Sequence, residues 1–558
     1  MNKITLKNKL RLYIAKYGCF LLFVLSVVVS LVTTYYVTGN VLDSDASSEM
    51  ILAHQLAQTG KIMTMDWLYS TEIRVLNSQL VFALFFHFFE DWHMVRFCSA
   101  VLLQGVMVAT YWFMLNRAGI RKQTIWLCEA MLLLPVSVTY GRIVLYHSHY
   151  IMHILLAFLL IGMFFAFADG IRWKKVGTYV NMLLIMGLSF IGGLAGVRYL
   201  MVIHAPLLLS IVLLCFVEDF KEEDCKKASL LSSQKLQLLL CVVLMAAASL
   251  AGVIINKVIF SKYFSFLEYT ETTMELLGAA DFSDLLYGFF HQFGYRKGQS
   301  LLSLMGILSL PGLVAGCYCV VSSVKKLIQH EKKHDIKKAI IDVFFLSFTI
   351  VMLALFLLTG GEANYYFVLY LSLSYPWVIS NVVEDLQTYK SKGNPLNVRC
   401  IFYWITFACL WVNGFANIGF YLGNETFDQH YEGLIYNNVK CVEQKVPVIS
   451  FLRENDYTIG YATYWEANVM TEISDGNIQM INLLLDKETG NIEYYNWLTS
   501  LYVREIPNEK PFILVTQDEK TIFEQSDSFQ FCTFAYEDEY HCVYDISAMD
   551  AFIPSLYY

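Results

Sequence analysis

"YGCFLLFVLSVVVSLVTTYYVTGNVLDSDASSEM", residues 17–50, is the stretch that decides how the chain is organised. Its apolar part ends near Val37 and can cross a bilayer, because a spanning helix needs about 20 mainly apolar residues. No small-residue cleavage site follows, so we interpret it as a membrane anchor and not as a signal peptide. The carboxylates of Asp43, Asp45 and Glu49 come directly after it. Their chemistry therefore depends on the side of the membrane that they face.

The whole chain has the composition of a membrane protein. It has 558 residues, of which 56% are hydrophobic and only 16% are charged, far from the average of soluble proteins. No basic stripe with interleaved aromatic residues is present, which argues against nucleic-acid binding. We predict an α-helical polytopic fold with about eleven transmembrane helices. The predicted spans cover residues 18–38, 93–116, 124–141, 150–168, 178–196, 200–217, 236–259, 301–323, 339–358, 364–382 and 400–421.

The distribution of lysine and arginine predicts the orientation. With a cytoplasmic N-terminus, the segments assigned to the inside carry 24 of the 40 Lys and Arg, whereas the outer loops 39–91, 140–149, 260–300 and 359–363 carry 6. This asymmetry fits the positive-inside rule. An odd number of spans then places the C-terminus outside. We expect a multi-pass plasma-membrane protein whose first outer loop is 39–91.

Residues 422–558 are expected to form an outer domain after a transmembrane module at 1–421. The stretch "VPVISFLRENDYTIGYATYWEANVMTEISDGNIQMINLL" (446–484) alternates helical and strand patterns, with turns at "END" and "SDG". This pattern predicts a small α/β domain. Its cysteines leave two readings open, a Cys532–Cys542 disulfide with Cys441 unpaired, or three free thiols.

The acidic segment at 43–49 has a functional and a structural interpretation. A carboxylate beside a membrane surface can act as a general base toward a hydroxyl, and Asp43 with Asp45 can also share a divalent cation. Alternatively, "SDASSEMILAHQLAQTG" (44–60) is a short amphipathic helix with Ser44 or Asp45 as its N-cap, Gly60 past its end and Asp43 solvated.

Two arginines are predicted on the same side of the membrane. Arg142 lies at the outer end of the third span, and Arg198 lies in the hairpin between the fifth and sixth. Placing a guanidinium near the membrane costs free energy unless the group faces a partner. Its planar set of N–H donors matches the oxygens of a phosphate. Snorkelling to the interface is the alternative. Three neighbouring side chains could add donors to a phosphate pocket, namely Tyr146, His147 and His149, and a zinc site of His147, His149 and His153 is a further alternative.

Other residues of the first outer loop could line a substrate pocket. They are Glu49, Trp67, Tyr69, Glu72 and Arg74. An interfacial aromatic belt is the alternative for Trp67 and Tyr69. No Walker loop, dinucleotide fingerprint or nucleophile elbow is present. "GGLAG" (192–196) lies between two predicted spans and indicates close helix packing.

This layout resembles the GT-C superfamily of membrane glycosyltransferases, whose bacterial members include relatives of protein O-mannosyltransferases and of the lipid A aminoarabinose transferase. The resemblance covers the whole chain in layout. It is carried by "DSDASSEM" (43–50), "WLYSTEIRVLNSQLVFALFFHFF" (67–89), "GGLAGVRYLMVIHAP" (192–206), "GEANYYFVLYLSLSYP" (361–376) and "GYATYWEANVMTEISDGNI" (460–478).

The resemblance implies transfer of a sugar from a polyprenyl-phosphate donor in the membrane to a glycan or protein acceptor on the outer face, usually with inversion. It implies a role in the assembly of cell-envelope glycans such as cell-wall polysaccharide. Asp43 is the expected base and Asp45 the second candidate, with Mg or Mn as a possible cofactor on the same pair. Arg198 would bind the donor phosphate. Many relatives carry Asp-Glu where this chain has Asp-Ser-Asp, and Arg-Tyr where it has Asn364-Tyr365.

Three rival functions stay open at this point. A transporter or exporter of lipid-linked glycans would show polar residues and broken helices near the bilayer midplane, whereas polar residues here gather at the outer rim. A polysaccharide polymerase would rely on arginines in large outer loops. A surface-binding protein would work through the outer domain alone.

Overall fold

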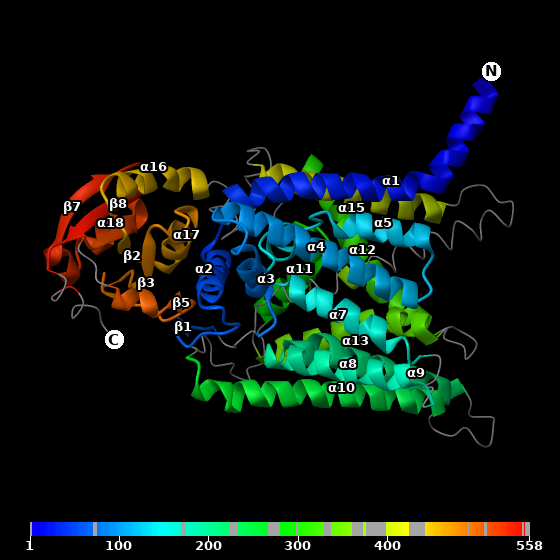
Figure 1. Ribbon diagram of the computed structural model, residues 1–558. Helices are drawn as coiled ribbons and strands as arrows, with labels where there is room; N and C mark the ends of the chain where they lie inside the picture. The colour runs from blue at the N-terminus through cyan, green and yellow to red at the C-terminus, as the bar shows by residue number, and fades with distance from the viewer. Residues whose placement is uncertain are drawn as a thin grey trace. The chain divides into compact units, whose positions relative to one another are not determined.

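The computed structural model divides the chain into two compact units (Figure 1). Unit 1 comprises Met1–Thr33, Leu102–Ile254 and Glu271–Phe420, and unit 2 comprises Thr34–Val101, Ile255–Thr270 and Tyr421–Tyr558. The first outer loop and the C-terminal segment therefore belong to one unit, although they are far apart in the sequence. The structure describes residues 3–70, 75–168, 174–221, 233–265, 279–296, 300, 302–328, 336–359, 372–374, 398–422, 441–488, 490–506, 510–548 and 552.

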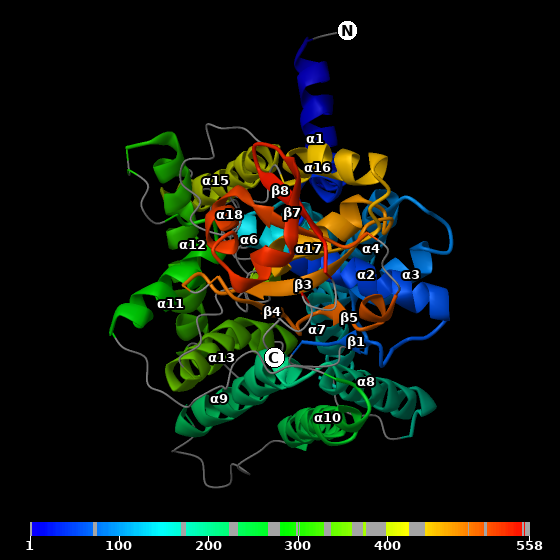
Figure 2. The same ribbon diagram turned by 90° about the vertical axis from the view of Figure 1, so that its left-hand side faces the viewer.

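Unit 1 is built from helices, and in both views α9 and α13 run side by side (Figures 1 and 2). The long helices α1 (Lys3–Asn40), α4 (Trp92–Arg117) and α10 (Ser233–Val258) contribute residues to both units. The other helices are α5 (Lys122–Leu132), α6 (Val138–Tyr140), η1 (Gly141–Tyr146), α7 (Ile151–Phe164), α8 (Val176–Leu194), η2 (Leu200–His204), α9 (Ala205–Lys221), α11 (Ala279–Gln292), α12 (Leu304–Ile328), α13 (Ile336–Thr359) and α15 (Val398–Tyr421).

The lengths and composition of these helices confirm a multi-pass membrane protein. Within the described ranges, six helices are long and apolar enough to span a bilayer, and they belong to α1, α4, α8, α10, α12 and α13. A bent pair formed by Val138–Tyr146 and Ile151–Phe164 raises this number to as many as seven. The predicted total of eleven is not reached by these criteria. Most of the predicted tenth span, 364–382, lies outside the described residues.

The third predicted span, 124–141, is not one continuous helix. α5 ends at Leu132, shortly before Pro135, which has no N–H to donate and disfavours a helical conformation in the residue before it. The freed carbonyls are satisfied by α15, where Asn417 donates to the oxygen of Pro135 at 2.7 Å and Asn413 to that of Val136 at 2.9 Å. Irregular backbone at membrane depth is tolerated under these conditions, when neighbouring helices supply the partners.

Glycines allow α8 and α10 to pack closely, as "GGLAG" predicts. A Cβ atom on Gly193 would lie 1.9 Å from the carbonyl oxygen of Ser249, and one on Gly252 would lie 2.3 Å from that of Phe190. No side chain fits at either position. Backbone contact between small residues is a usual way for membrane helices to associate.

The C-terminal part of unit 2 is the predicted α/β domain. Its described residues form a six-stranded sheet in the order β4-β3-β2-β6-β8-β7, towards the viewer in Figure 2. β2 is parallel to β3 and to β6, and the other neighbours are antiparallel. The strands are β2 (Ile459–Thr463), β3 (Gln479–Leu485), β4 (Ile492–Tyr494), β6 (Phe512–Thr516), β7 (Cys532–Glu537) and β8 (His541–Ile546), and the helices are α16 (Cys441–Glu454), α17 (Tyr464–Ile473) and α18 (Gln517–Phe523).

Alternating apolar residues give the sheet a core on each face. Ile513 and Val515 face a cluster that includes Phe523 of α18, whereas Phe512 and Leu514 face the cluster under α16 and α17. Gly460 is required on the second face, because a Cβ there would lie 2.3 Å from the Phe512 ring.

Of the two readings left open for Cys532 and Cys542, the structure supports free thiols and not the disulfide. Cys532 lies opposite Ile546 in the ladder, and Cys542 lies opposite Glu537, so the two thiols are several residue pairs apart along the hairpin. Both cysteines are free, and so is Cys441. The spacing of the two cysteines in the sequence does not give the register of the strands, which sets which side chains meet.

The loop 39–91, predicted to lie outside, folds onto this domain within unit 2. It contains α2 (Ser44–Thr59), β1 (Trp67–Leu68) and α3 (Ser78–Phe85), and β1 pairs antiparallel with β5 (Thr499–Ser500). Gly60 ends α2 with φ +64°, as predicted for a glycine past the end of a helix. The predicted domain boundary between residues 421 and 422 stays a prediction.

Candidate functional site

Asp43 is the N-cap of α2. Its backbone is extended, and its Oδ1 accepts a hydrogen bond from the Ala46 N–H at 2.8 Å. The residue is only 4% exposed. The expectation that Ser44 or Asp45 caps the helix while Asp43 is solvated is therefore wrong, because the chain leaves its extended conformation one residue earlier. A carboxylate at this place is held in a fixed orientation and lies at the positive end of the helix dipole.

Asp45 lies in the first turn of α2 and is exposed. Its Oδ1 accepts a short hydrogen bond from the hydroxyl of Tyr464, the first residue of α17. The Ser44 hydroxyl donates to the carbonyl of Tyr464, and Asn468 donates to the carbonyl of Ser44 at 3.4 Å. The acidic segment is thus bound to α17 by side chains from both partners.

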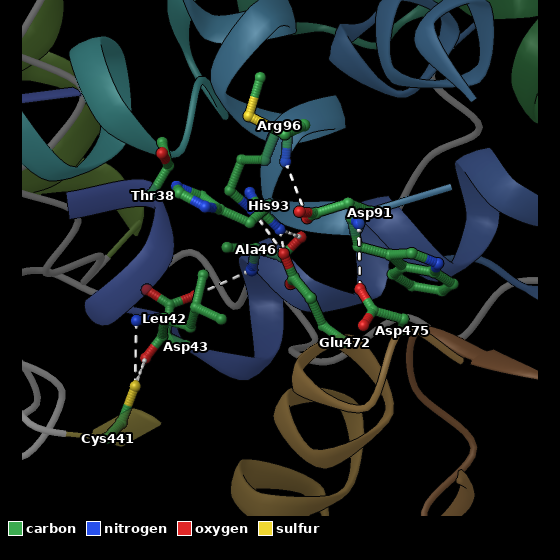
Figure 3. Close-up of polar contacts among 12 residues, drawn as sticks. Thr38, Leu42, Asp43, Ala46, Asp91, His93, Arg96, Cys441, Glu472 and Asp475 are labelled. Atoms are coloured by element: carbon green, nitrogen blue, oxygen red, sulfur yellow. Dashed lines mark hydrogen bonds and ion pairs between the residues drawn. The ribbon is translucent and has the colours of Figure 1, made fainter. Parts of the chain in front are cut away.

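A buried ion pair continues this interface (Figure 3). Arg96, near the start of α4, donates from Nε and Nη2 to the two carboxylate oxygens of Glu472 in α17, at 2.6 and 2.7 Å. Nη2 also donates to the carbonyl of Ala46 at 3.1 Å. The guanidinium is completely buried. This fork ties α4, α17 and the first turn of α2 together.

Cys441 fixes the residue just before the acidic segment. Its Sγ accepts from the Leu42 N–H at 3.1 Å and donates to the Leu42 carbonyl at 3.2 Å (Figure 3). Burial raises the pKa of the thiol to about 12, so it stays a neutral donor. Leu42 and Val469 pack with it in a small apolar cluster.

The other described candidates in the loop 39–91 have partners of their own. Glu49 is buried and accepts from Ser78 at 2.6 Å and from Asn77 at 3.3 Å, where α3 begins. Trp67 and Tyr69 are buried in a cluster with Leu52 and Leu56 and not exposed on a surface. Glu72 and Arg74 lie outside the described residues, as do Asn364 and Tyr365.

A second charged cluster lies next to the start of α17. Lys445 in α16 pairs with Glu466 at 2.7 Å, and the Nε2 of His541 lies 3.4 Å from the same carboxylate oxygen. Burial by itself would raise the pKa of Glu466, but Lys445 and His541 lower it to about 2. The carboxylate is therefore ionised whenever the domain is folded at ordinary pH.

This cluster predicts an acid-dependent loss of stability. Because the folded pKa of Glu466 is below the ordinary 4.5, its contribution is complete above about pH 4.5 and disappears as the pH falls toward 2. The difference corresponds to at most about 3 kcal/mol. Glu466→Gln should lower the melting temperature at pH 7 and flatten its fall between pH 4.5 and 2, measured by thermal melts in detergent. Equal acid sensitivity in the variant and the parent protein would contradict this.

In unit 1 the two candidate arginines lie at π-helices. Arg142 belongs to η1, and Arg198 comes just before η2. π-Helices are rare and are frequent at functional sites. The guanidinium carbon of Arg198 is 5.6 Å from the ring centre of Tyr150, whose N–H donates to the carbonyl of Ile143 in η1 at 2.9 Å. Tyr150, in the turn at 147–150, therefore contacts both Arg198 and the π-helix that contains Arg142.

The histidines of this turn are buried. The ring centres of His147 and His149 are 6.0 Å apart, whereas His153 stacks on Tyr199 with ring centres at 4.9 Å and planes 7° apart. His153 thus has a different neighbour from His147 and His149. This arrangement does not favour a zinc site formed by all three histidines. Tyr146 is buried in η1.

Sequence reasoning missed the residues that hold the acidic segment. Tyr464, Asn468 and Glu472 recur every four residues, so they form one stripe along α17. This spacing in the sequence indicates a polar face on the helix. Their partners, however, lie about 376 to 424 positions away in the chain, so spacing could not identify them.

Comparison with known proteins gives structural neighbours only. No protein-family model matches the chain, and no curated protein matches it. The archaeal oligosaccharyltransferase AglB from Archaeoglobus fulgidus, in complex with an inhibitory peptide and a dolichol-phosphate, is 11% identical at a TM-score of 0.49, with 96% of this chain and 75% of that chain covered. The same enzyme in complex with Zn and sulfate is 12% identical at a TM-score of 0.45, with 94% and 73% covered. ArnT from Cupriavidus metallidurans, bound to undecaprenyl phosphate, is 11% identical at a TM-score of 0.48, with 95% and 98% covered.

Proposed function

We propose that the protein transfers a sugar from a polyprenyl-phosphate donor to a glycan or protein acceptor on the outer face of the plasma membrane, in the assembly of cell-envelope glycans. The N-terminus is then cytoplasmic and the α/β domain extracytoplasmic. The observation that carries the proposal is the position of Asp43. It is a buried carboxylate, oriented by a helix N-terminus, directly after the membrane-length helix α1. The undecaprenyl phosphate of the ArnT structure belongs to the class of lipid that we propose as carrier.

The reaction that we propose is a displacement with inversion. Asp43 takes the proton of the acceptor hydroxyl while the hydroxyl oxygen attacks the anomeric carbon, and the bond from that carbon to the phosphate oxygen breaks. Negative charge then builds on the leaving lipid phosphate. Arg198 and Arg142 are the groups that we assign to this charge, with His147 and His149 as additional donors.

A divalent cation such as Mg or Mn is a possible cofactor. The carboxylates of Asp43 and Asp45 are the hard oxygen ligands that these ions prefer, so the residue types fit. A bound cation would supply positive charge near the leaving phosphate. The steps assigned to Asp43 and to the arginines do not depend on it.

Arg198→Ala should raise the KM for the lipid-linked donor by about 10- to 100-fold, because a hydrogen bond to a charged group contributes about 1.5–3 kcal/mol. Arg198→Lys keeps the charge but loses the planar fork, so its KM should be intermediate. Arg117→Ala is a matched control, since the guanidinium of Arg117 covers a Phe113 ring at 5.4 Å much as Arg198 covers Tyr150. Steady-state kinetics with purified protein and a polyprenyl-phosphate sugar make the comparison. The same KM in the Arg198 and Arg117 variants would remove Arg198 from the donor site.

The function as a whole is tested by glycan analysis of the cell envelope. A deletion strain should lack one sugar or branch of its envelope glycan, and the wild-type gene should restore it. Purified protein should transfer the same sugar from its polyprenyl-phosphate carrier. A strain that accumulates complete lipid-linked glycan on the inner leaflet, together with inactive purified protein, would instead identify an exporter.

A further inference from the structure

The polar face of α17 forms hydrogen bonds with the first residues of α2, directly or through Arg96. Tyr464 binds Asp45 and Ser44, Asn468 binds Ser44, and Glu472 reaches Ala46 through Arg96. Three successive turns of α17 therefore contact the first three residues of α2, the last of them through Arg96. Such a match between two helices needs more than apolar packing, because each polar contact fixes one position along the axis.

The residues that form these contacts differ in burial. Tyr464 is 6% exposed, Asn468 and Glu472 are buried, and so is Asp43 at the N-cap of α2. Asp45, by contrast, is exposed although it accepts the Tyr464 hydroxyl. A buried tyrosine thus directs its hydroxyl at a carboxylate that is open to solvent. This leaves the second oxygen of Asp45 in an orientation set by α17.

The Tyr464 hydroxyl can act only as a neutral donor. Burial and the negative charge of Asp45 raise the pKa of Tyr464 well above its ordinary value. The direction of this hydrogen bond therefore does not change over the pH range in which the protein works. The Cys441 thiol, also neutral, holds Leu42 on the other side of Asp43.

From this geometry we propose that α17 of the C-terminal domain positions the acidic segment for sugar transfer, with Tyr464 as the positioning residue that orients Asp45 and the first turn of α2. The inference rests on the proposed function for its catalytic consequence. The C-terminal domain then takes part in catalysis through the first outer loop, without contributing a residue that touches the sugar.

The test compares two tyrosine variants. In Tyr464→Phe only the hydroxyl is lost, and kcat should fall by about 10- to 100-fold with an unchanged KM for the donor, since small misplacements of reacting groups have effects of this size. Tyr457→Phe is the matched control, because the Tyr457 hydroxyl donates to Asp545 within the same domain, away from α2. Tyr457→Phe should keep the parental kcat.

Two further measurements separate positioning from general weakening of the fold. Hydrogen exchange of the backbone amides at 44–50 should become faster in Tyr464→Phe and stay unchanged in Tyr457→Phe. The double variant Tyr464→Phe with Asp45→Ala should lose no more activity than the more impaired single variant, because each change removes the same hydrogen bond.

The outcomes distinguish the two proposals. If Asp43→Asn is inactive while Tyr464→Phe equals Tyr457→Phe in kcat and in exchange, the positioning role is overturned and the proposed function stands. If Asp43→Asn keeps full activity, Asp43 is not the base, and if the parent protein transfers no sugar from a polyprenyl-phosphate donor, the proposed function fails. In that case the exchange measurement still decides whether α17 holds the acidic segment.

Discussion

Replacing Asp43 by asparagine should lower kcat for sugar transfer by about 100- to 10,000-fold, the range that general-base catalysis contributes. Asparagine cannot take the proton of the acceptor hydroxyl. It does cap helices as well as aspartate does, so the hydrogen bond to the Ala46 N–H is kept and the melting temperature should not change. The measurement is the rate of transfer from a polyprenyl-phosphate sugar by the purified protein, beside a thermal melt.

Two companion variants show whether the charge or the cap matters. Asp43→Ala removes both, so it should be as inactive as Asp43→Asn and also lose about 1 kcal/mol of stability. Asp45→Asn keeps Asp43 intact and should be less impaired. A parental kcat in Asp43→Asn would exclude this residue as the base, and greater loss in Asp45→Asn would transfer the role to Asp45.

Glu472→Gln should be the most destabilising of the variants considered, at about 3–5 kcal/mol. Breaking a buried ion pair from one side leaves the other charge in a medium that solvates it poorly. Arg96 is completely buried and would keep its charge, with the Ala46 carbonyl at 3.1 Å as a remaining acceptor. Thermal melts in detergent should show a large fall in the melting temperature.

The ion pair between Lys520 and Glu537 provides the control. Its atoms are 2.8 Å apart, close to the distance in the buried pair, but both side chains are partly exposed. Lys520→Met should leave the melting temperature nearly unchanged, because exposed pairs contribute little. The double variant Arg96→Met with Glu472→Met should be more stable than Glu472→Gln, since it removes both buried charges. A double variant less stable than Glu472→Gln would contradict this account of the pair.

Elements that depend on local periodicity could be predicted from the sequence. The alternation of helical and strand patterns at 446–484 predicted α16, β2, α17 and β3, and Gly60 predicted the end of α2. The membrane helices followed from length and apolarity alone. The cap of α2 was misplaced because Asp43, Ser44 and Asp45 are all good cap residues, and only tertiary contacts decide among them.

Features that depend on distant contacts could not be predicted. The break after Leu132 follows from Pro135, but its stability depends on asparagines of α15 about 280 positions away. The contacts of Tyr464 and Glu472 with the acidic segment and Arg96 are of the same kind. A sequence pattern indicates that such side chains are polar on an apolar helix, but not which partner satisfies them.

The strand order of the C-terminal sheet has one more consequence. After β2 the chain crosses to β3 on one side, and β6 pairs with β2 on the other, which creates the crevice at the carboxyl ends of the strands where open α/β sheets receive nucleotides. Here Lys445, Glu466 and His541 lie at that edge, since Glu466 follows β2 and His541 pairs with Thr516 at the end of β6. The charged groups at this edge of the sheet therefore pair with one another inside the domain, so the edge is closed by side chains of the chain itself.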